Sequence, residues 1–182
     1  LSSRRRVKPN GVVVYNGPSV LDRRRKVVLV VTGLSRKSEN PKTGDMALAW
    51  ILTYDENPAE AHHNGTDKAM CGDCPVKEPC YVDWSKAPSS IWRAWKRGSY
   101  PTSTPEAASF LVAGRALRMG AAGDPAAVPT AVWKQLLAKV RRWTGYTHQW
   151  RKPVVAPLRS LVMASVESEA DALLAHGLGW RT

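Results

Sequence analysis

The stretch KVVLVVTG at residues 26–33 decides the fold, because it holds five successive apolar residues without a polar alternation. Four of the five are valine, and β-branched side chains favour strands. A strand without a polar face is buried on both sides, as is typical of parallel sheets covered by helices. A second apolar run, MALAWILT at residues 46–53, predicts another strand, with a helix as the alternative.

Beyond residue 104 the pattern alternates regularly between helices and strands. Thr104 is placed to cap a helix that has Pro105 at its first position, and Ser168 is placed to cap a last helix. The predicted order is helix 104–114, strand 115–120, helix 129–142, strand 143–148, strand 160–165 and helix 168–177. Strands separated by helices predict a parallel sheet with right-handed crossovers. We therefore expect an α/β fold, either an open sheet or a partial barrel of the TIM type.

The length and composition predict one globular domain. The chain has 182 residues, with 43% hydrophobic and 23% charged residues, which is close to the average of globular proteins. Residues 1–10 are basic and polar and are interpreted as a tail. Residues 11–182 form the predicted α/β domain, into which a cysteine-containing loop at about residues 55–88 is inserted.

The net charge favours an anionic partner. Lys and Arg total 27 against 15 Asp and Glu, which gives +12 and a pI near 10.0. Nucleic acid or another anionic ligand fits this charge, although a solvated tail would explain the arginine runs at 4–6 and 23–25 equally well. The sequence has neither an apolar run long enough to span a membrane nor a signal-peptide pattern at its N-terminus, so we expect a cytoplasmic protein without a membrane partner.

The three cysteines predict a metal centre. Cys71, Cys74 and Cys80 have the spacing C-x2-C-x5-C, and two residues between thiolates allow a tight turn to aim both sulfurs inward. An odd number of clustered cysteines fits a metal site in a reducing compartment better than disulfides. Ordinary reduced thiols are the alternative.

Iron is favoured over zinc at these cysteines. Structural zinc sites complete four ligands from two Cys or His pairs, whereas this chain offers one pair and one further cysteine within ten residues. The compact loop is more typical of a four-iron four-sulfur cluster, with zinc as the alternative. The fourth ligand is left to His62, His63, His148, water or a substrate.

Polar residues follow three of the predicted strands and are expected to meet at one edge of the sheet. These are Gly123 and Asp124, residues 146–149, and Ser165 with Glu167. We predict that His148 and Asp124 lie near the exposed iron and contribute to binding a cofactor or small molecule. The alternatives are a histidine that only satisfies backbone groups and an aspartate that forms a turn before Pro125.

Tryptophans interleaved with cations suggest a second, non-enzymatic hypothesis. Trp92 and Trp95 alternate with Arg93, Lys96 and Arg97, as in proteins that stack bases and neutralise phosphates. A zinc-stapled basic module would then bind nucleic acid through this segment and the arginine-rich N-terminus. Packing of the tryptophans on the core is the simpler alternative.

The chain also resembles an uncharacterised family of bacteriophage and prophage proteins. The matching segments are YNGPSVLD at 15–22, NPKTGDM at 40–46, CGDCP at 71–75 with CYV at 80–82, GAAGDP at 120–125, TGYTHQW at 144–150 and GWRT at 179–182. The resemblance implies a protein of the host bacterial cytoplasm, with a host protein as a further possible partner, and it carries no established activity. The family pattern continues into another cysteine-rich stretch, so the resemblance implies a shortened member or a simpler site.

A more distant resemblance connects the cysteine loop and the following strands to radical enzymes that cleave S-adenosylmethionine on a partial barrel. Their C-x3-C-x2-C loop is not present here. The sequence therefore predicts a phage-encoded iron–sulfur protein and leaves open whether it is an enzyme.

Overall fold

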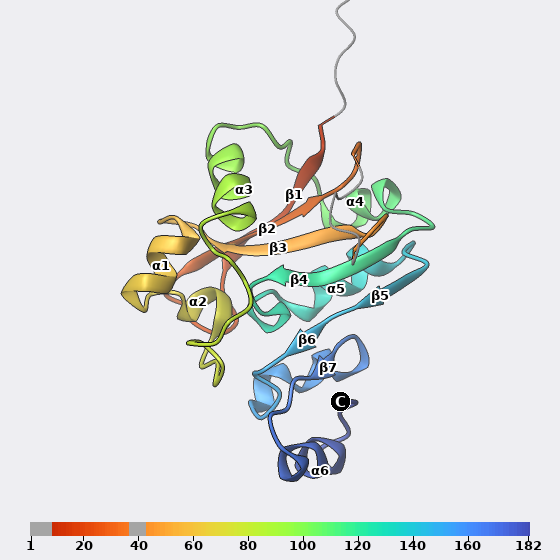
Figure 1. Ribbon diagram of the computed structural model, residues 1–182. Helices are drawn as coiled ribbons and strands as arrows, with labels where there is room; N and C mark the ends of the chain where they lie inside the picture. The colour runs from red at the N-terminus through yellow and green to blue at the C-terminus, as the bar shows by residue number, and fades with distance from the viewer. Residues whose placement is uncertain (1–8, 37–42) are drawn as a thin grey trace, which may run out of the picture.

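The computed structural model describes residues 9–36 and 43–182 and contains a five-stranded sheet with the strand order β1-β2-β3-β4-β5 (Figure 1). The predicted basic tail lies almost entirely outside the described residues. The strands are β1 Gly11–Pro18, β2 Lys26–Thr32, β3 Ala47–Thr53, β4 Ala116–Ala122 and β5 Arg142–Thr144. The α/β fold is thus confirmed, and both long apolar runs are strands.

The sheet is mixed, so the prediction of a parallel sheet is wrong for its first half. β1 pairs antiparallel with β2, and β2 pairs antiparallel with β3. Only β3, β4 and β5 pair in parallel. The apolar run in β2 correctly reports that residues 27–31 are fully buried, but burial on two faces follows from helices on both sides and does not fix strand direction.

Helices cover both faces of the sheet, with α3 in front and α5 behind in the view of Figure 1. α1 packs against α3, and α4 packs against α5. Thr104 and Ser168 cap α4 and α6 as predicted, accepting hydrogen bonds from the Ala107 and Asp171 amides at 3.1 Å each. The helices are α1 Pro58–Asn64, α2 Lys68–Cys71, α3 Ala87–Lys96, α4 Pro105–Leu111, α5 Thr130–Leu137 and α6 Glu169–Gly177. No helix within 9–36 or 43–182 has both the length and the apolar character needed to cross a bilayer.

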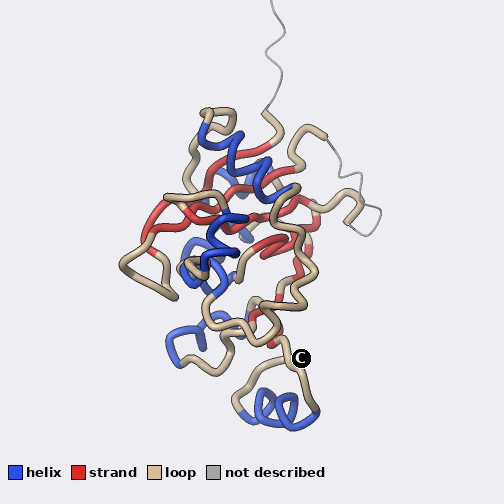
Figure 2. The backbone as a smooth tube through the Cα atoms, turned by 60° about the vertical axis from the view of Figure 1, so that its left-hand side comes forward, coloured by secondary structure: helices blue, strands red, loops and turns tan. Residues whose placement is uncertain are grey.

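Two short strands beyond β5 form a separate, two-stranded sheet. After β5 the chain passes Gly145 into β6 (Tyr146–Thr147), which pairs in parallel with β7 (Met163–Ala164). The strand predicted at 160–165 is shorter than expected because residues up to Ser160 form a 3₁₀ helix, η2 Pro153–Ser160. Figure 2 shows α6 standing apart from the sheet at the C-terminal end of the chain.

Glycines allow the end of β4 to approach β3 closely. Gly123 has φ +76°, and a Cβ atom there would lie 2.8 Å from Ile51 Cβ and overlap the Ile51 carbonyl oxygen. The next residue, Asp124, caps a one-turn 3₁₀ helix, η1 Pro125–Ala127. The glycine-rich segment therefore serves close packing between two strands, which positions Asp124 at their carboxyl ends.

We expect Gly123→Ala to lower the free energy of unfolding by about 3 kcal/mol, because it combines a left-handed backbone with overlap against backbone atoms. Gly98→Ala is the matched control, since Gly98 has φ +73° with open space around it and should lose only about 1 kcal/mol. Urea denaturation of both variants tests this. Equal losses would show that the close approach to Ile51 contributes nothing.

Candidate functional site: a cavity lined by the three cysteines

A cavity of about 400 Å³ lies at the carboxyl ends of the parallel strands, beneath the segment that connects α2 to α3. Figure 1 shows this segment passing the tip of β4. All three cysteines, Cys71, Cys74 and Cys80, line the cavity. The strands contribute Met119, Gly120, Ala122, Gly123 and Asp124 from the end of β4, Thr144, Gly145, Tyr146 and His148 from β5 and β6, and Ser165 after β7. The predicted convergence of strand ends on one mouth is therefore confirmed.

The thiols of Cys71 and Cys74 lie in an environment that disfavours the thiolate. Burial, followed by the negative charges of Asp67 and Asp124, raises the pKa of Cys71 well above its ordinary value. Burial also raises the pKa of Cys74, although a backbone hydrogen bond from Val76 opposes the shift. Charge on Cys80 adds to both shifts, and charge on Cys74 adds to that of Cys71. Without a bound cation, the site favours protonated thiols at Cys71 and Cys74.

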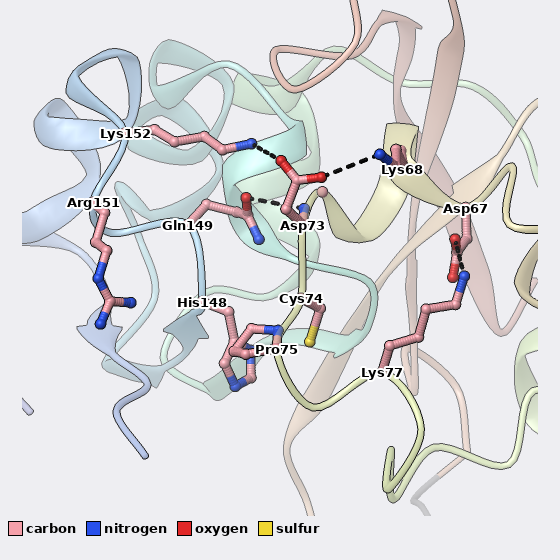
Figure 3. Close-up of a pocket in the computed structure, with 11 residues that line it drawn as sticks. Asp67, Lys68, Asp73, Cys74, Pro75, Lys77, His148, Gln149, Arg151 and Lys152 are labelled. Carbon is pink, nitrogen blue, oxygen red and sulfur yellow. Dashed lines mark hydrogen bonds and ion pairs between the residues drawn. The ribbon is translucent and has the colours of Figure 1, made fainter. Parts of the chain in front are cut away.

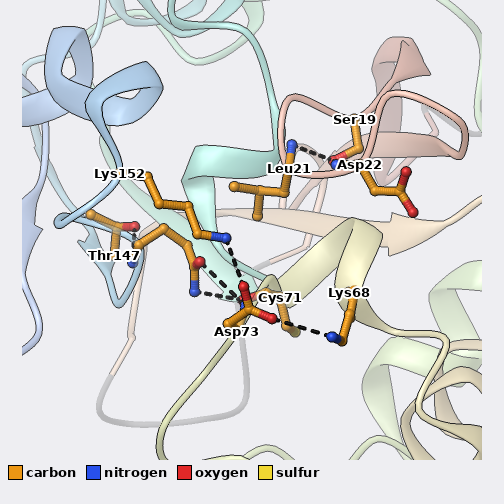
Figure 4. Close-up of polar contacts among 9 residues, drawn as sticks. Ser19, Leu21, Asp22, Lys68, Cys71, Asp73, Thr147 and Lys152 are labelled. Carbon is orange, nitrogen blue, oxygen red and sulfur yellow. Dashed lines mark hydrogen bonds and ion pairs between the residues drawn. The ribbon is translucent and has the colours of Figure 1, made fainter.

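Cys71 is the last residue of helix α2, and hydrogen bonds from neighbouring segments hold this helix in place. The Ser19 hydroxyl donates to the carbonyl oxygen of Ala69 at 2.6 Å and accepts from the Leu21 amide (Figure 4). The backbone amide of Asp124 donates to the carbonyl oxygen of Met70 at 2.7 Å. The end of β4 and the turn after β1 thus hold the last turn of α2 from two sides.

Gln149 holds the turn between Cys71 and Cys74. Its side-chain amide donates to the Cys71 carbonyl at 3.1 Å and accepts from the Asp73 amide at 3.3 Å (Figure 3). The intervening Gly72 has φ +64°, and a Cβ atom there would lie 2.5 Å from the Gln149 side chain. Gln149 is 2% exposed, so this glycine and this glutamine form a fitted pair.

The carboxylate of Asp73 is held between two lysines. Lys152 Nζ lies 2.9 Å from one carboxylate oxygen, and Lys68 Nζ lies 3.4 Å from the other (Figures 3 and 4). The hydrogen bond from Lys152 is the main cause of a lowered Asp73 pKa. These contacts tie the cysteine turn to the segment after β6.

Asp124 lies on the cavity, but its hydrogen bonds give it a structural role. One carboxylate oxygen accepts from the Ala126 amide at 2.8 Å and the other from the His148 amide at 2.9 Å. Burial raises the Asp124 pKa above its ordinary value, and these hydrogen bonds partly oppose the shift. The carboxylate therefore joins the ends of β4 and β6. Its remaining lone pairs are its only capacity for a ligand.

His148 lines the cysteine cavity, and the other two candidate histidines have other surroundings. Its Nε2 atom lies 3.4 Å from the Glu167 carboxylate, which leaves Nδ1 for another partner. His62 instead bonds to the buried Asp67 carboxylate at 2.9 Å and stacks on Trp84. His63 is exposed. Among the three predicted alternatives for a histidine ligand, the geometry therefore favours His148.

A second cavity, of about 550 Å³, lies behind the cysteine turn and shares Cys74 and His148 with the first (Figure 3). Its cations are all paired. Lys77 lies 2.8 Å from Asp67, Arg151 pairs with Asp171, and Lys68 and Lys152 bind Asp73. Each of these cations is therefore within ion-pair distance of a carboxylate, and Lys68 and Lys152 share that of Asp73.

In the described part of the chain, no three Cys, His, Asp or Glu side chains are grouped so that they could hold one metal ion. Three thiolates on one zinc ion would place their sulfurs roughly 3.8 Å apart, given Zn–S bonds of about 2.3 Å. A cubane cluster is bound through different irons and accommodates sulfurs that are further apart.

Several residues of the site could not be recognised from the sequence. Gln149 is an ordinary polar residue beside His148 in the sequence, and its contact with Gly72 joins positions 77 apart. Arg118 projects from β4 to the mouth of the cavity, where it donates to the Tyr81 hydroxyl at 2.9 Å. Trp84 lines the cavity, and its Nε1 is the one buried side-chain nitrogen or oxygen atom without a hydrogen-bond partner among the described residues. None of these contacts has a local sequence signature.

Neither a family model, nor a curated protein, nor a solved structure matches this chain.

We expect Gln149→Ala to lower the free energy of unfolding by about 2 kcal/mol, because it leaves the Cys71 carbonyl and the Asp73 amide without partners. Gln135→Ala is the control, since Gln135 is an exposed residue of the same type on α5 and should change stability by less than about 0.5 kcal/mol. Urea denaturation of the metal-free protein measures both. A loss of stability no larger than that of Gln135→Ala would contradict the conclusion that Gln149 holds the cysteine turn.

Alkylation rates should follow the thiol environments. In the metal-free protein at neutral pH, Cys71 should react with iodoacetamide at least about tenfold more slowly than Cys74, because its pKa is raised further and only thiolates react. Raising the pH should accelerate both reactions, with Cys71 responding last. Mass spectrometry of the labelled peptides gives the rates. Equal rates would show that the turn opens when no metal is bound.

Proposed function

We propose that the protein holds a four-iron four-sulfur cluster on Cys71, Cys74 and Cys80. The observation that supports this proposal is that these residues, the only cysteines in the chain, all line one cavity at the carboxyl ends of parallel strands. Three thiolates leave one iron without a cysteine ligand. Zinc, the alternative, would require the three sulfurs to close around a single ion.

His148 is proposed as the protein group nearest to the iron without a cysteine ligand. Glu167 next to its Nε2 would orient the ring and leave Nδ1 available, as carboxylates do for metal-binding histidines. Asp124 is proposed to act mainly by positioning His148, because its carboxylate accepts a hydrogen bond from the His148 backbone amide. A bound cluster would supply one-electron transfer and an iron able to bind an oxygen or nitrogen atom of a small molecule.

We further propose that the parallel strands form a partial barrel around the site. β3, β4 and β5 are adjacent and parallel, and β6 continues the direction of β5 to pair with β7. Functional groups of such barrels lie at the carboxyl ends of the strands, as the cavity does here. On the resemblance to phage proteins, we propose that the protein works in the cytoplasm of a host bacterium.

Anaerobic purification should yield brown protein that contains about four irons and four sulfides per chain and absorbs at about 400 nm. Each of Cys71→Ser, Cys74→Ser and Cys80→Ser should lose most of the iron, because the chain has no other thiol to replace the lost ligand. Iron and sulfide analysis, with thermal unfolding of the metal-free variants as the folding control, tests this.

Colourless protein with about one equivalent of zinc would contradict the cluster and favour the zinc alternative. Iron retained in all three serine variants would contradict the cysteine ligands. Protein that takes up neither metal after oxygen-free reconstitution would leave three ordinary thiols and overturn the proposal.

A further inference from the structure

A cleft rich in arginine lies at the end of the sheet opposite to the cysteine cavity. It has a volume of about 790 Å³ and is lined by residues that precede β3 and β4 and that begin β5. Its cations are Arg36, Arg115, Arg141 and Arg142, and Asp45 is the one carboxylate among its described lining residues. The cleft thus concentrates positive charge at the amino ends of the parallel strands.

The backbone that carries these arginines is held in place. The Arg36 amide donates to the Asn10 side chain at 2.9 Å, and the Arg141 amide donates to the Arg115 carbonyl at 2.9 Å. The Arg115 guanidinium donates to the backbone carbonyl of Asp45 at 2.8 Å, which fixes its direction. The arginines therefore belong to anchored segments at the rim of one cleft.

Most of this charge is uncompensated. Within the described residues, Arg36, Arg141 and Arg142 form no ion pair, and all three are exposed. The lysines and the arginine of the cavity behind the cysteine turn are, in contrast, each paired with a carboxylate. Unpaired guanidinium groups around a cleft are suited to phosphate, which they can bind through two parallel hydrogen bonds.

Asn10 fixes the rim of the cleft, because its side-chain oxygen accepts from the amides of Ser35 and Arg36. The four arginines thus line one cleft together, from the rim to the starts of β4 and β5. A partner with phosphates repeated along its length can contact several of these guanidinium groups at once, whereas a single small phosphate cannot.

The tryptophan segment proposed from the sequence is less suitable for the same partner. Lys96 Nζ lies 4.6 Å from the Tyr54 ring, 5.1 Å from that of Trp92 and 4.7 Å from that of Trp95. Trp92 Nε1 also donates to the Thr53 carbonyl at 2.8 Å. These rings are engaged with the protein itself, as the packing alternative predicts, and are poorly placed to stack on bases.

We propose that the cleft formed by Arg36, Arg115, Arg141 and Arg142 binds the phosphate backbone of a nucleic acid. The described lining residues include no aromatic side chain, so binding rests on phosphate contacts without base stacking and has little sequence preference. This function is separate from the cysteine site, since the two lie at opposite ends of the same strands.

Fluorescence anisotropy with labelled single-stranded DNA, double-stranded DNA and RNA of mixed sequence tests the proposal. We expect Arg141→Ala/Arg142→Ala to weaken binding about tenfold at 0.1 M salt, taken as roughly physiological, and to reduce the slope of log K against log salt by about 1.5. Arg93→Ala/Arg97→Ala on α3 is the matched control, because it removes the same charge from exposed positions outside the cleft. It should change binding by less than about twofold.

Equal weakening by both double variants would overturn the proposal that the cleft is the binding site and would favour non-specific attraction by net charge. Absence of salt-sensitive binding to all three nucleic acids would overturn it entirely. Competition by inorganic tripolyphosphate at matched ionic strength that is as strong as by unlabelled oligonucleotide would replace nucleic acid with a small polyphosphate. Cys74→Ser should bind nucleic acid like the unmodified protein, so failure of the iron proposal would leave this one standing.

Discussion

The last three carbonyl groups of α2 before the cysteine turn are each bound by a different segment, and the arrangement of the site depends on this. Ala69 accepts from the Ser19 hydroxyl, Met70 from the Asp124 amide and Cys71 from the Gln149 side chain. The final carbonyls of a helix have no partners within it, and leaving them buried and unpaired costs about 1–3 kcal/mol each. A four-residue helix would not be stable alone, so these contacts keep Cys71 in place.

The same contacts explain why the site lies where it does. Ser19 follows β1, Asp124 follows β4 and Gln149 follows β6, so α2 joins the antiparallel half of the sheet to its parallel half. The close approach of Gly123 to Ile51 brings β4 near enough to β3 for Asp124 to reach α2. The carboxyl ends of the parallel strands then form the floor of the cavity, and the segment after α2 forms its cover. The cysteine turn is thereby supported by the ends of these strands.

The sequence predicted those features that depend on local pattern. Burial of residues 27–31, the caps at Thr104 and Ser168, and the meeting of polar strand ends all follow from periodicity, capping chemistry and the alternation of helices with strands. Strand direction could not be predicted, because a strand buried on both faces has the same apolar sequence pattern whether its neighbours run parallel or antiparallel, and β2 is antiparallel to both. The dual contacts of Asp124 and the fit of Gln149 against Gly72 could not be predicted either, since each joins distant residues whose types are individually ordinary.

The basic residues that give the chain its positive charge have different surroundings at the two ends of the parallel strands. Beside the cysteine turn, Lys77 neutralises Asp67, and Lys68 and Lys152 neutralise Asp73. Even with Lys77 beside Asp67, burial and the charges of Asp67 and Asp124 disfavour ionisation of Cys71, so loss of that lysine would disfavour it further. At the other end of the strands, Arg36, Arg141 and Arg142 have no such task among the described residues and remain exposed. Basic residues therefore occur in two settings, beside the carboxylates of the cysteine turn and, at the opposite end of the strands, as exposed cations without a carboxylate partner among the described residues.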